Sequence, residues 1–110
     1  MDCIFCKIIN GDIPSKKIYE TETVLAFHDI NPKAPVHVLI IPKIHVKDIN
    51  SLKREHSQFI EDIFTSIPEI AKELNVYESG YRIVVNNGKD SGQEVFHLHF
   101  HLLGGAPLPF

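Results

Sequence analysis

The stretch VFHLHFHLLGG, residues 95–105, constrains the fold more than any other part of this 110-residue chain. Its three histidines, His97, His99 and His101, are each separated by one apolar residue. Successive side chains of a β-strand point to opposite faces, so this alternation predicts a strand that carries all three imidazoles on one face. The opposite face would pack on the core through the apolar residues of the same stretch: Leu98, Phe100 and Leu102.

Three imidazoles on one strand face call for a chemical explanation, because histidine seldom fills the outer face of a half-buried strand. Imidazole serves in proteins as a metal ligand, as a general acid or base, and as a nucleophile. The Gly-rich segment NGKDSGQ, residues 87–93, precedes the histidines, and its glycines would let backbone N–H groups approach an oxyanion. The combination indicates a phosphate site and favours phosphorus chemistry with a histidine nucleophile.

Apolar periodicity and turn residues predict the remaining elements. These are a short helix over 4–10, strands over 16–20, 23–30, 36–42 and 80–86, one long helix from about 52 to 74 that Pro68 kinks rather than divides, and a last strand over 94–103. Strands and helices do not alternate regularly, so the order favours an α+β fold with a mostly antiparallel five-stranded sheet over a doubly wound one. We expect residues 1–110 to form one domain, whose small core would benefit from a partner subunit.

Composition restricts the classes of function. The chain is 44% hydrophobic and 23% charged, as globular proteins are, and its net charge of −3 argues against binding nucleic acid polymers. No apolar run is long enough to cross a membrane, and residues 1–10 lack the apolar core of a signal peptide. We therefore expect a cytoplasmic protein, in which a cysteine pair indicates metal or redox chemistry rather than a structural disulfide.

Several stretches together carry a family resemblance. VFHLHFHLL matches the pattern H-x-H-x-H-x-x with apolar x, and the other stretches are CIFCKIINGDIPSKKIYE, LAFHDINPKAPVHVLIIPKIHV and YRIVVNNGKDSGQEVFHLHFHLLGG. On these residues the chain resembles the histidine triad (HIT) family and, within it, the Hint branch of nucleotide-binding proteins. The resemblance implies a HIT-like fold, a homodimer, and an enzyme that hydrolyses purine nucleoside phosphoramidates, of the AMP–amine or acyl-AMP type, through a nucleotidyl-histidine intermediate.

The resemblance also implies roles for individual residues around the phosphate. His99 would attack the α-phosphorus while its other ring nitrogen donates to the backbone carbonyl of His97, and His101 would donate to phosphate oxygens. Gln93 would help to hold the phosphate. Glu94 stands where several relatives carry serine near the leaving group, and its carboxylate would either protonate a departing amine or point to solvent.

The nucleoside is expected on LAFHDI and on residues close to it. Asp29 matches the residue that accepts hydrogen bonds from the ribose hydroxyls, although its place before Asn31–Pro32 is equally typical of a turn. Asn86 matches a residue near the phosphate. The resemblance implies a purine pocket formed by five further residues: Phe5, Ile8, Phe27, His28 and Ile30.

Cys3 and Cys6 form a C-x-x-C pair, which by itself supplies half of a zinc site. Two buried thiols are the simpler interpretation, and a redox pair would normally follow a strand. Some members of the wider superfamily bind zinc, and the resemblance to them completes the ligand set with His45 and His97. We therefore expect a structural Zn²⁺ on these four residues. His37, in the apolar strand over 36–42, is expected to be a core residue without a catalytic role.

Three other functions stay open at this point. The same site could cleave dinucleoside polyphosphates, as another branch of the family does, although CIFCKII and LLGG favour the phosphoramidate branch. A non-enzymatic nucleotide- or zinc-binding module is the second alternative, and the intact triad argues against it because binding alone needs no nucleophile at residue 99. A cupin-type histidine–metal site would need a glutamate ligand after the histidine pair and would not use the cysteines.

Overall fold

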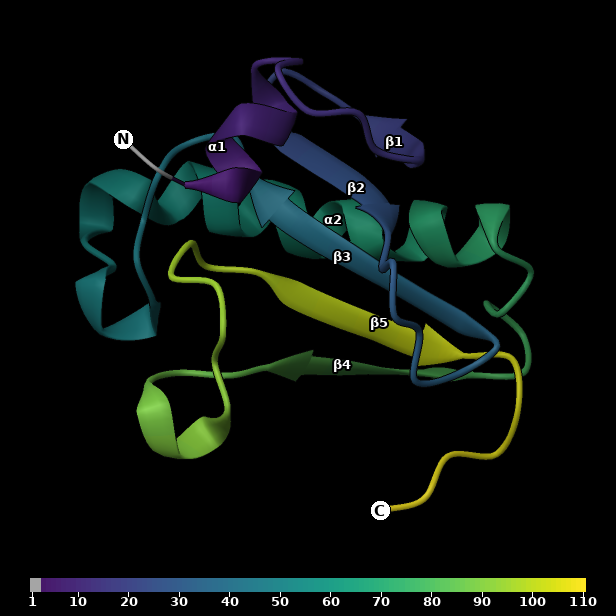
Figure 1. Ribbon diagram of the computed structural model, residues 1–110. Coiled ribbons are helices and arrows are strands. Elements are labelled where there is room, and N and C mark those ends of the chain that lie inside the picture. The colour runs from purple at the N-terminus through teal and green to yellow at the C-terminus, as the bar shows by residue number, and fades with distance from the viewer. Residues whose placement is uncertain (1–2) are drawn as a thin grey trace.

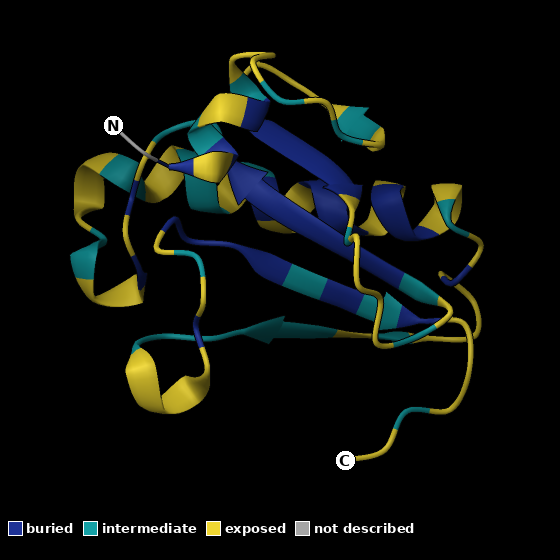
Figure 2. Ribbon diagram, viewed as in Figure 1, coloured by how far each residue is buried: buried dark blue, intermediate teal, exposed yellow. Residues whose placement is uncertain are grey.

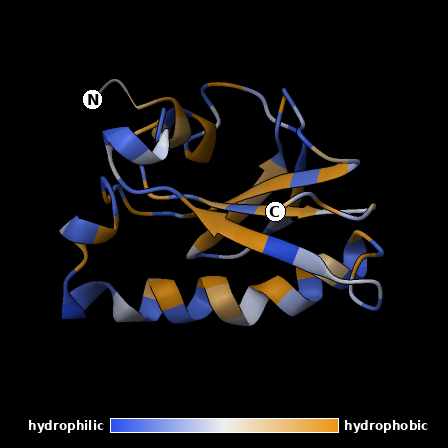
Figure 3. Cartoon of the chain, turned by 90° about the horizontal axis from the view of Figure 1, so that it is seen from below, coloured by the Kyte–Doolittle hydropathy of each residue, from blue (hydrophilic) through white to orange (hydrophobic). Residues whose placement is uncertain are grey.

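The computed structural model describes residues 3–110 and shows an antiparallel sheet with one helix on each face (Figures 1 and 3). Its strands are β1 (Lys17–Glu20), β2 (Val24–His28), β3 (Val36–Pro42), β4 (Tyr81–Val85) and β5 (Phe100–Gly104). They lie in the order β1-β2-β3-β5-β4, and every neighbouring pair is antiparallel. The α+β fold expected from the sequence is confirmed.

Two different helices cover the two faces of the sheet, because apolar side chains occupy consecutive positions of β2 and β3 and alternate between the faces. One set packs in the cluster that contains the long helix α2 (Ser57–Glu73): Val24, Ala26, Val38 and Ile40. The other set packs in the cluster that contains the short helix α1 (Ile4–Ile9): Leu25, Phe27, Leu39 and Ile41. The central strands are therefore buried on both faces (Figure 2).

The long helix begins at Ser57, later than the expected residue 52. Two short 3₁₀ turns, Ile49–Ser51 and Arg54–His56, precede it. The backbone N–H of Lys53 donates to Nδ1 of His56 at 2.9 Å, and this local bond closes a separate turn instead of extending the helix. The predicted N-terminal boundary was wrong because side-chain capping of this kind has no apolar periodicity.

Pro68 lies inside α2, and the helix runs through it to Glu73. Proline has no backbone N–H, so the carbonyl of Phe64 loses its helical partner. Both side chains lie on the exposed side of the helix, where water can solvate that carbonyl. The expectation of one helix rather than two is confirmed. The buried side of α2 packs on the sheet through Ile63, Ile67, Ile70 and Ala71.

The last strand begins at Phe100 rather than at residue 94. Phe100 lies opposite Ile40, and two residues further along β3 stands Pro42, which has no N–H to continue the ladder. The N–H of Leu98 donates instead to the carbonyl of Val46, at 2.7 Å. The alternation nevertheless continues upstream of the strand, because Leu98, Phe100 and Leu102 all lie in the core that faces α2.

The six-residue helix α1 covers only one end of its face of the sheet. The uncovered part, over β3 and β5, presents His37 from β3 together with His99 and His101. The imidazoles thus line an opening that the short helix leaves beside it. No helix among residues 3–110 is both long and apolar enough to span a bilayer.

Candidate active site and metal centre

A cleft of about 360 Å³ lies on the uncovered face of the sheet. The loop that follows β2 and the start of β3 form one wall, with Asp29, Lys33 and His37. The segment between β4 and β5 forms the other, with Asn86 and Glu94, while His99 and His101 line the cleft as well. The cleft therefore joins segments from both halves of the sequence.

His99 presents a free ring nitrogen in this cleft. Its Nδ1 lies 2.8 Å from the backbone carbonyl oxygen of His97, and since a carbonyl only accepts, Nδ1 carries the proton. In the neutral ring Nε2 then holds the lone pair. Burial lowers the pKa of His99, so the imidazole is neutral at neutral pH. A buried, oriented and unprotonated imidazole nitrogen is a nucleophile or a base.

His101 has the opposite tautomer, which a chain of hydrogen bonds fixes. The backbone N–H of Lys33 donates to Nδ1 of His37 at 3.0 Å, so the proton of neutral His37 is on Nε2. That Nε2 lies 2.9 Å from Nδ1 of His101 and donates to it. Nε2 of His101 therefore carries a proton. Burial, together with the neighbouring His99 and His37, lowers the pKa of His101 to about 4, so this donor is uncharged.

Asp29 forms the turn that its sequence position suggested, and it also lines the cleft. Its Oδ1 accepts the backbone N–H of Asn31 at 2.7 Å, which makes it a turn former. Its Oδ2 lies 3.5 Å from Nε2 of His37, and the residue lines the cleft. Asp29 also comes close to both His37 and His101, but the proton on Nε2 of His37 makes this group a hydrogen-bonded cluster rather than a set of free metal ligands.

The Gly-rich loop is braced by the side chain of Gln93, which is buried. Its Oε1 accepts the N–H of Gly88 at 2.8 Å, and its Nε2 donates to the carbonyls of Lys47 and Val95 at 3.0 and 3.1 Å. The amide is thus engaged with Gly88, Lys47 and Val95, and Gln93 is not among the residues that line the cleft. Gly92, at φ 88°, lines the cleft in a left-handed conformation that favours glycine.

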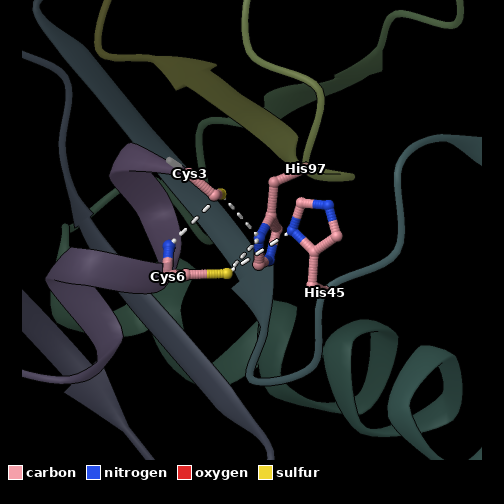
Figure 4. A group of neighbouring side chains, drawn as sticks. All are labelled: Cys3, Cys6, His45 and His97. Atoms are coloured by element: carbon pink, nitrogen blue, oxygen red, sulfur yellow. Dashed lines mark hydrogen bonds between the residues drawn. The ribbon is translucent and has the colours of Figure 1, made fainter. Parts of the chain in front are cut away.

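A second group of side chains lies at the end of α1 nearest His97. Figure 4 shows Cys3 and Cys6 with their sulfurs toward the imidazoles of His45 and His97. Sγ of Cys3 lies 3.4 Å from Nδ1 of His97, while Sγ of Cys6 lies 3.4 Å from Nδ1 of His45 and 3.6 Å from that of His97. One ligand atom from each of the four residues lies within 4.8 Å of the others, close enough to hold a metal ion.

The donor set fits a tetrahedral metal ion. In a zinc site with ordinary bond lengths, a sulfur and a nitrogen lie about 3.6 Å apart, close to the separations above. Nε2 of His97 donates to the carbonyl of Pro42 at 3.0 Å, which leaves Nδ1 unprotonated and turned to the thiols. Burial lowers the pKa of His97 to about 4, which keeps that nitrogen free of a proton. Burial and the adjacent Cys3 raise the pKa of the Cys6 thiol to about 11, a cost that a bound cation would offset.

Comparison with known proteins agrees with this geometry. The family model of the HIT domain matches residues 10–108. The chain is 45% identical over 107 residues to the purine nucleoside phosphoramidase of Escherichia coli strain K12, covering 97% of this chain and 90% of that protein. A histidine triad protein from Clostridium difficile superposes with a TM-score of 0.96 at 48% identity, over 100% of this chain and 96% of the other. For a HIT family hydrolase from Legionella pneumophila Philadelphia 1 the TM-score is 0.95 at 42% identity, and the match covers 99% of this chain and 97% of the other.

The chain belongs to the HIT family. The expected family and the HIT-like fold are both confirmed, and the relatives make the chain a hydrolase of this family. In this HIT protein the residues expected to form a purine pocket occupy different environments. Phe5 lines the cleft, and Phe27 is buried against it with ring centroids 5.6 Å apart. Ile8 is buried in the same cluster. His28 is exposed, and Ile30, beside the cleft residue Asp29, is 93% exposed.

His37 lines the cleft of this HIT protein, although the sequence analysis gave it no functional role. Its burial was expected, but it contacts His101 and Asp29 and lines the cleft. The register of β3 against β5 explains this position. His37 lies opposite Leu103 and therefore on the same face of the sheet as His101, two residues before Leu103. A pairing between strands so far apart in sequence is not visible in the local pattern around residue 37.

Proposed function

We propose that this protein hydrolyses purine nucleoside phosphoramidates and related AMP–amine or acyl-AMP compounds, releasing the nucleoside monophosphate. The observation that carries the proposal is the pair of opposite tautomers in the cleft: a bare Nε2 on His99 beside a protonated Nε2 on His101. Phosphoryl transfer through a histidine nucleophile needs one unprotonated nitrogen to attack the phosphorus and a donor to stabilise the phosphate oxygens. The name of the 45% identical relative from Escherichia coli, purine nucleoside phosphoramidase, supports the substrate class.

In the proposed mechanism Nε2 of His99 attacks the α-phosphorus. A bond from Nε2 to phosphorus forms while the bond from phosphorus to the leaving group breaks; a departing amine takes a proton from solvent, and a departing acyl group leaves as a carboxylate. Water then attacks the phosphorus and loses a proton to solvent while the bond from phosphorus to Nε2 breaks, which returns His99 to its neutral form. The bond from Nδ1 of His99 to the carbonyl of His97, 2.8 Å long, holds the ring in the reactive tautomer during both steps.

His101 and the Gly-rich loop stabilise the phosphate in this proposal. Nε2–H of His101 is an uncharged donor turned to the cleft by the chain from Lys33 through His37. Gly92 brings backbone into the cleft wall, where N–H groups can approach phosphate oxygens. The loop keeps its shape because Gln93 ties it to Lys47 and Gly88. Gln93 thus acts indirectly, by positioning the loop.

The nucleoside lies, in this proposal, along the wall that holds Asp29 and Phe5. The Asp29 carboxylate keeps acceptor capacity for ribose hydroxyls beside its turn bond to Asn31. The ring of Phe5 gives the base an apolar surface, and the exposed Ile30 is free to cover it. Asn86 and Glu94 stand on the opposite wall, near the phosphate and the leaving group.

We further propose that the four-residue metal centre holds zinc. Two thiols and two imidazoles are a ligand set typical of structural zinc, and the cytoplasm, where we place the protein, keeps thiols reduced. Zinc would supply a cross-link between α1 and the segment before β5, not a step of the reaction. Purified under reducing conditions without chelator, the protein should hold about one zinc ion per chain. Metal-free preparations would contradict this assignment.

A homodimer is the assembly that we propose. Within the described residues β4 pairs only with β5, so its other side is open to a strand from a second copy. Tyr81, Ile83 and Val85 of this strand are only partly buried. A sheet continued across two subunits would cover them. Sedimentation equilibrium tests this, and a monomer at high concentration would contradict it.

The decisive experiment compares two substrates. AMP release from an adenosine phosphoramidate with an alkylamine leaving group is measured beside cleavage of a diadenosine polyphosphate. Fast release from the phosphoramidate alone supports the proposal, and mass spectrometry of the quenched enzyme should then find a nucleotidyl adduct on His99. The variant His99→Ala should bind AMP and lose turnover.

Each other outcome excludes part of the proposal. Activity on the polyphosphate alone would keep the nucleophile and change the substrate class. No activity on either compound, with AMP still bound, would favour a nucleotide-binding module. Unchanged turnover in His99→Ala would remove the covalent mechanism.

A further inference from the structure

Two residues, His97 and Phe5, connect the metal centre with His99 in the cleft. His97 turns its side chain toward Cys3 and Cys6, while its backbone carbonyl accepts the proton of His99 Nδ1 at 2.8 Å. Phe5 lies between the two cysteines in the sequence, and its ring meets that of His99 edge to face, with centroids 5.1 Å apart and an interplanar angle of 88°. Two of the groups that contact the His99 ring thus belong to the metal centre or lie next to its ligands in the chain: the carbonyl of the ligand His97, and Phe5 between Cys3 and Cys6.

We propose that His97 and Phe5 are positioning residues for His99, and that metal bound to Cys3, Cys6, His45 and His97 keeps both in place. The occupancy of the metal centre would then set the turnover rate of the cleft. This inference rests on the proposed function, because it assigns the metal centre a role in the reaction proposed for the same site.

Helix α1 is too short to hold Phe5 rigidly on its own. A six-residue helix is far below the length at which isolated helices are stable in water. Phe5 and Ile8 anchor it by burial, whereas Ile4 and Lys7 are exposed. Its first turn is held by Cys3, whose Sγ accepts the N–H of Cys6 at 3.3 Å. The thiol contacts thus fix the end of the helix that carries Phe5.

Without metal, the contacts between thiols and imidazoles are only weak hydrogen bonds, because sulfur is a poor donor and acceptor. With metal, the same atoms become four coordinate bonds that join α1, the loop at His45 and the segment at His97. The Phe5 ring also meets the His97 ring, at 5.8 Å and 71°, so movement of either reaches His99. The expected result of metal loss is a poorly oriented His99 in a cleft whose nucleotide contacts persist.

The experiment compares the purified zinc-loaded protein with the same protein after chelation under reducing conditions. Two properties are measured well below the unfolding temperature of both forms: kcat and KM for the adenosine phosphoramidate, and the ¹⁵N chemical shifts of the His99 ring. We expect kcat to fall roughly tenfold on metal removal, with KM changed less than about twofold. The ¹⁵N shifts should change from one Nδ1–H tautomer to an exchanging mixture, and one equivalent of zinc should restore both properties.

A purely structural metal gives a different result. If the metal-free protein unfolds at lower temperature but keeps kcat and the His99 tautomer, the inference is overturned. If neither form hydrolyses the phosphoramidate while zinc still changes the His99 tautomer, the positioning stands and the proposed function fails. The two claims therefore fail separately.

Two variants test the coupling without chelation. His45→Ala removes a ligand that is exposed and lies outside the cleft lining, so the fold should tolerate it. We expect weaker zinc binding and a kcat lowered as in the chelated protein, whereas zinc loss with unchanged kcat would overturn the inference. Phe5→Leu should keep its zinc and still lower kcat. The matched control is His56→Ala, because among residues 3–110 the only hydrogen bond of the His56 side chain is the one it accepts from the N–H of Lys53 in a 3₁₀ turn.

Discussion

Nε2 of His37 lies 2.9 Å from Nδ1 of His101, and the backbone N–H of Lys33 on the far side of the His37 ring decides which nitrogen donates. The proton that His101 offers to the cleft is therefore specified by a residue one strand away. His37, which the sequence analysis assigned to the core, thus determines the tautomer of His101 in the cleft.

His37→Ala should lower kcat by roughly 10- to 100-fold, by analogy with metal-ligating histidines that lose an orienting outer partner. Without its donor, His101 is free to flip or to change tautomer, and the phosphate loses a fixed hydrogen bond. His37→Gln, which can accept from Lys33 and donate to His101, should recover part of the loss. Steady-state kinetics, with circular dichroism to verify folding, check this. Equal kcat in the alanine variant and the parent chain would remove His37 from the mechanism.

Asp29→Asn separates the two roles of Asp29. The variant keeps an oxygen for the N–H of Asn31, so the turn should survive. It loses the charge that strengthens hydrogen bonds from ribose hydroxyls, and such bonds contribute roughly 1.5–3 kcal/mol. We therefore expect AMP to bind about tenfold more weakly and the preference for AMP over its 2′-deoxy analogue to shrink. Calorimetric titration measures the affinity of the variant for both nucleotides. An unchanged preference for AMP over the 2′-deoxy analogue would leave Asp29 as a turn residue only.

Glu94→Gln tests the wall near the leaving group. The Glu94 side chain is exposed at the cleft and forms no hydrogen bond or ion pair with other residues in the range 3–110. If the Glu94 carboxyl group assists the departing amine, kcat/KM of Glu94→Gln for a substrate with an alkylamine leaving group should fall several-fold, while its affinity for AMP stays constant. Glu22→Gln, at an exposed position outside this cleft, is the matched control. Identical kinetics for the two variants would mean that Glu94 only faces solvent.

Stability should fall as the pH drops below neutrality. Burial lowers the pKa of His37, and burial with neighbouring imidazoles lowers that of His101 to about 4, whereas in the unfolded chain both lie near 6.5. Between about pH 4 and 6.5 the unfolded state binds more protons than the folded state. The free energy of unfolding is therefore largest above about pH 6.5 and declines toward pH 4.

Urea unfolding of the metal-free protein at about pH 7 and about pH 5 measures this decline. His101→Gln should show a shallower loss between the two, because one of the depressed groups is gone. If the free energy of unfolding falls equally in the parent chain and the variant, His101 does not contribute to the pH dependence of stability.

Local pattern predicted a large part of this molecule. The alternation from His97 to Leu102 placed the imidazoles and the apolar residues on opposite faces, because a strand allows only two directions. The start of the long helix escaped prediction, since Lys53 and His56 close a turn by a side-chain bond. The hydrogen bonds of the Gln93 amide were not predicted either, because one of them joins it to Lys47, 46 residues away in sequence.

The meeting of distant segments could not be predicted from local pattern. Cys6 and His97 are 91 residues apart, and the pairing of their ligand atoms follows from how α1 lies on the sheet. Family resemblance predicted His45 and His97 as partners of the cysteines, whereas the periodicity of the sequence does not indicate them. For His37 neither source was used, and only the register of β3 against β5 reveals its neighbour.

β5 lies between β3 and β4, so its placement has a consequence for the order of folding events. The contact between His37 and His101 closes a loop of 64 residues, and the entropy of closing it is lost before the contact forms. The hairpins of β1, β2 and β3 can assemble earlier, from neighbouring stretches of chain. We expect the insertion of β5 to complete the sheet and to bring the imidazoles together in one event, so a chain without β5 in place would lack the assembled cleft.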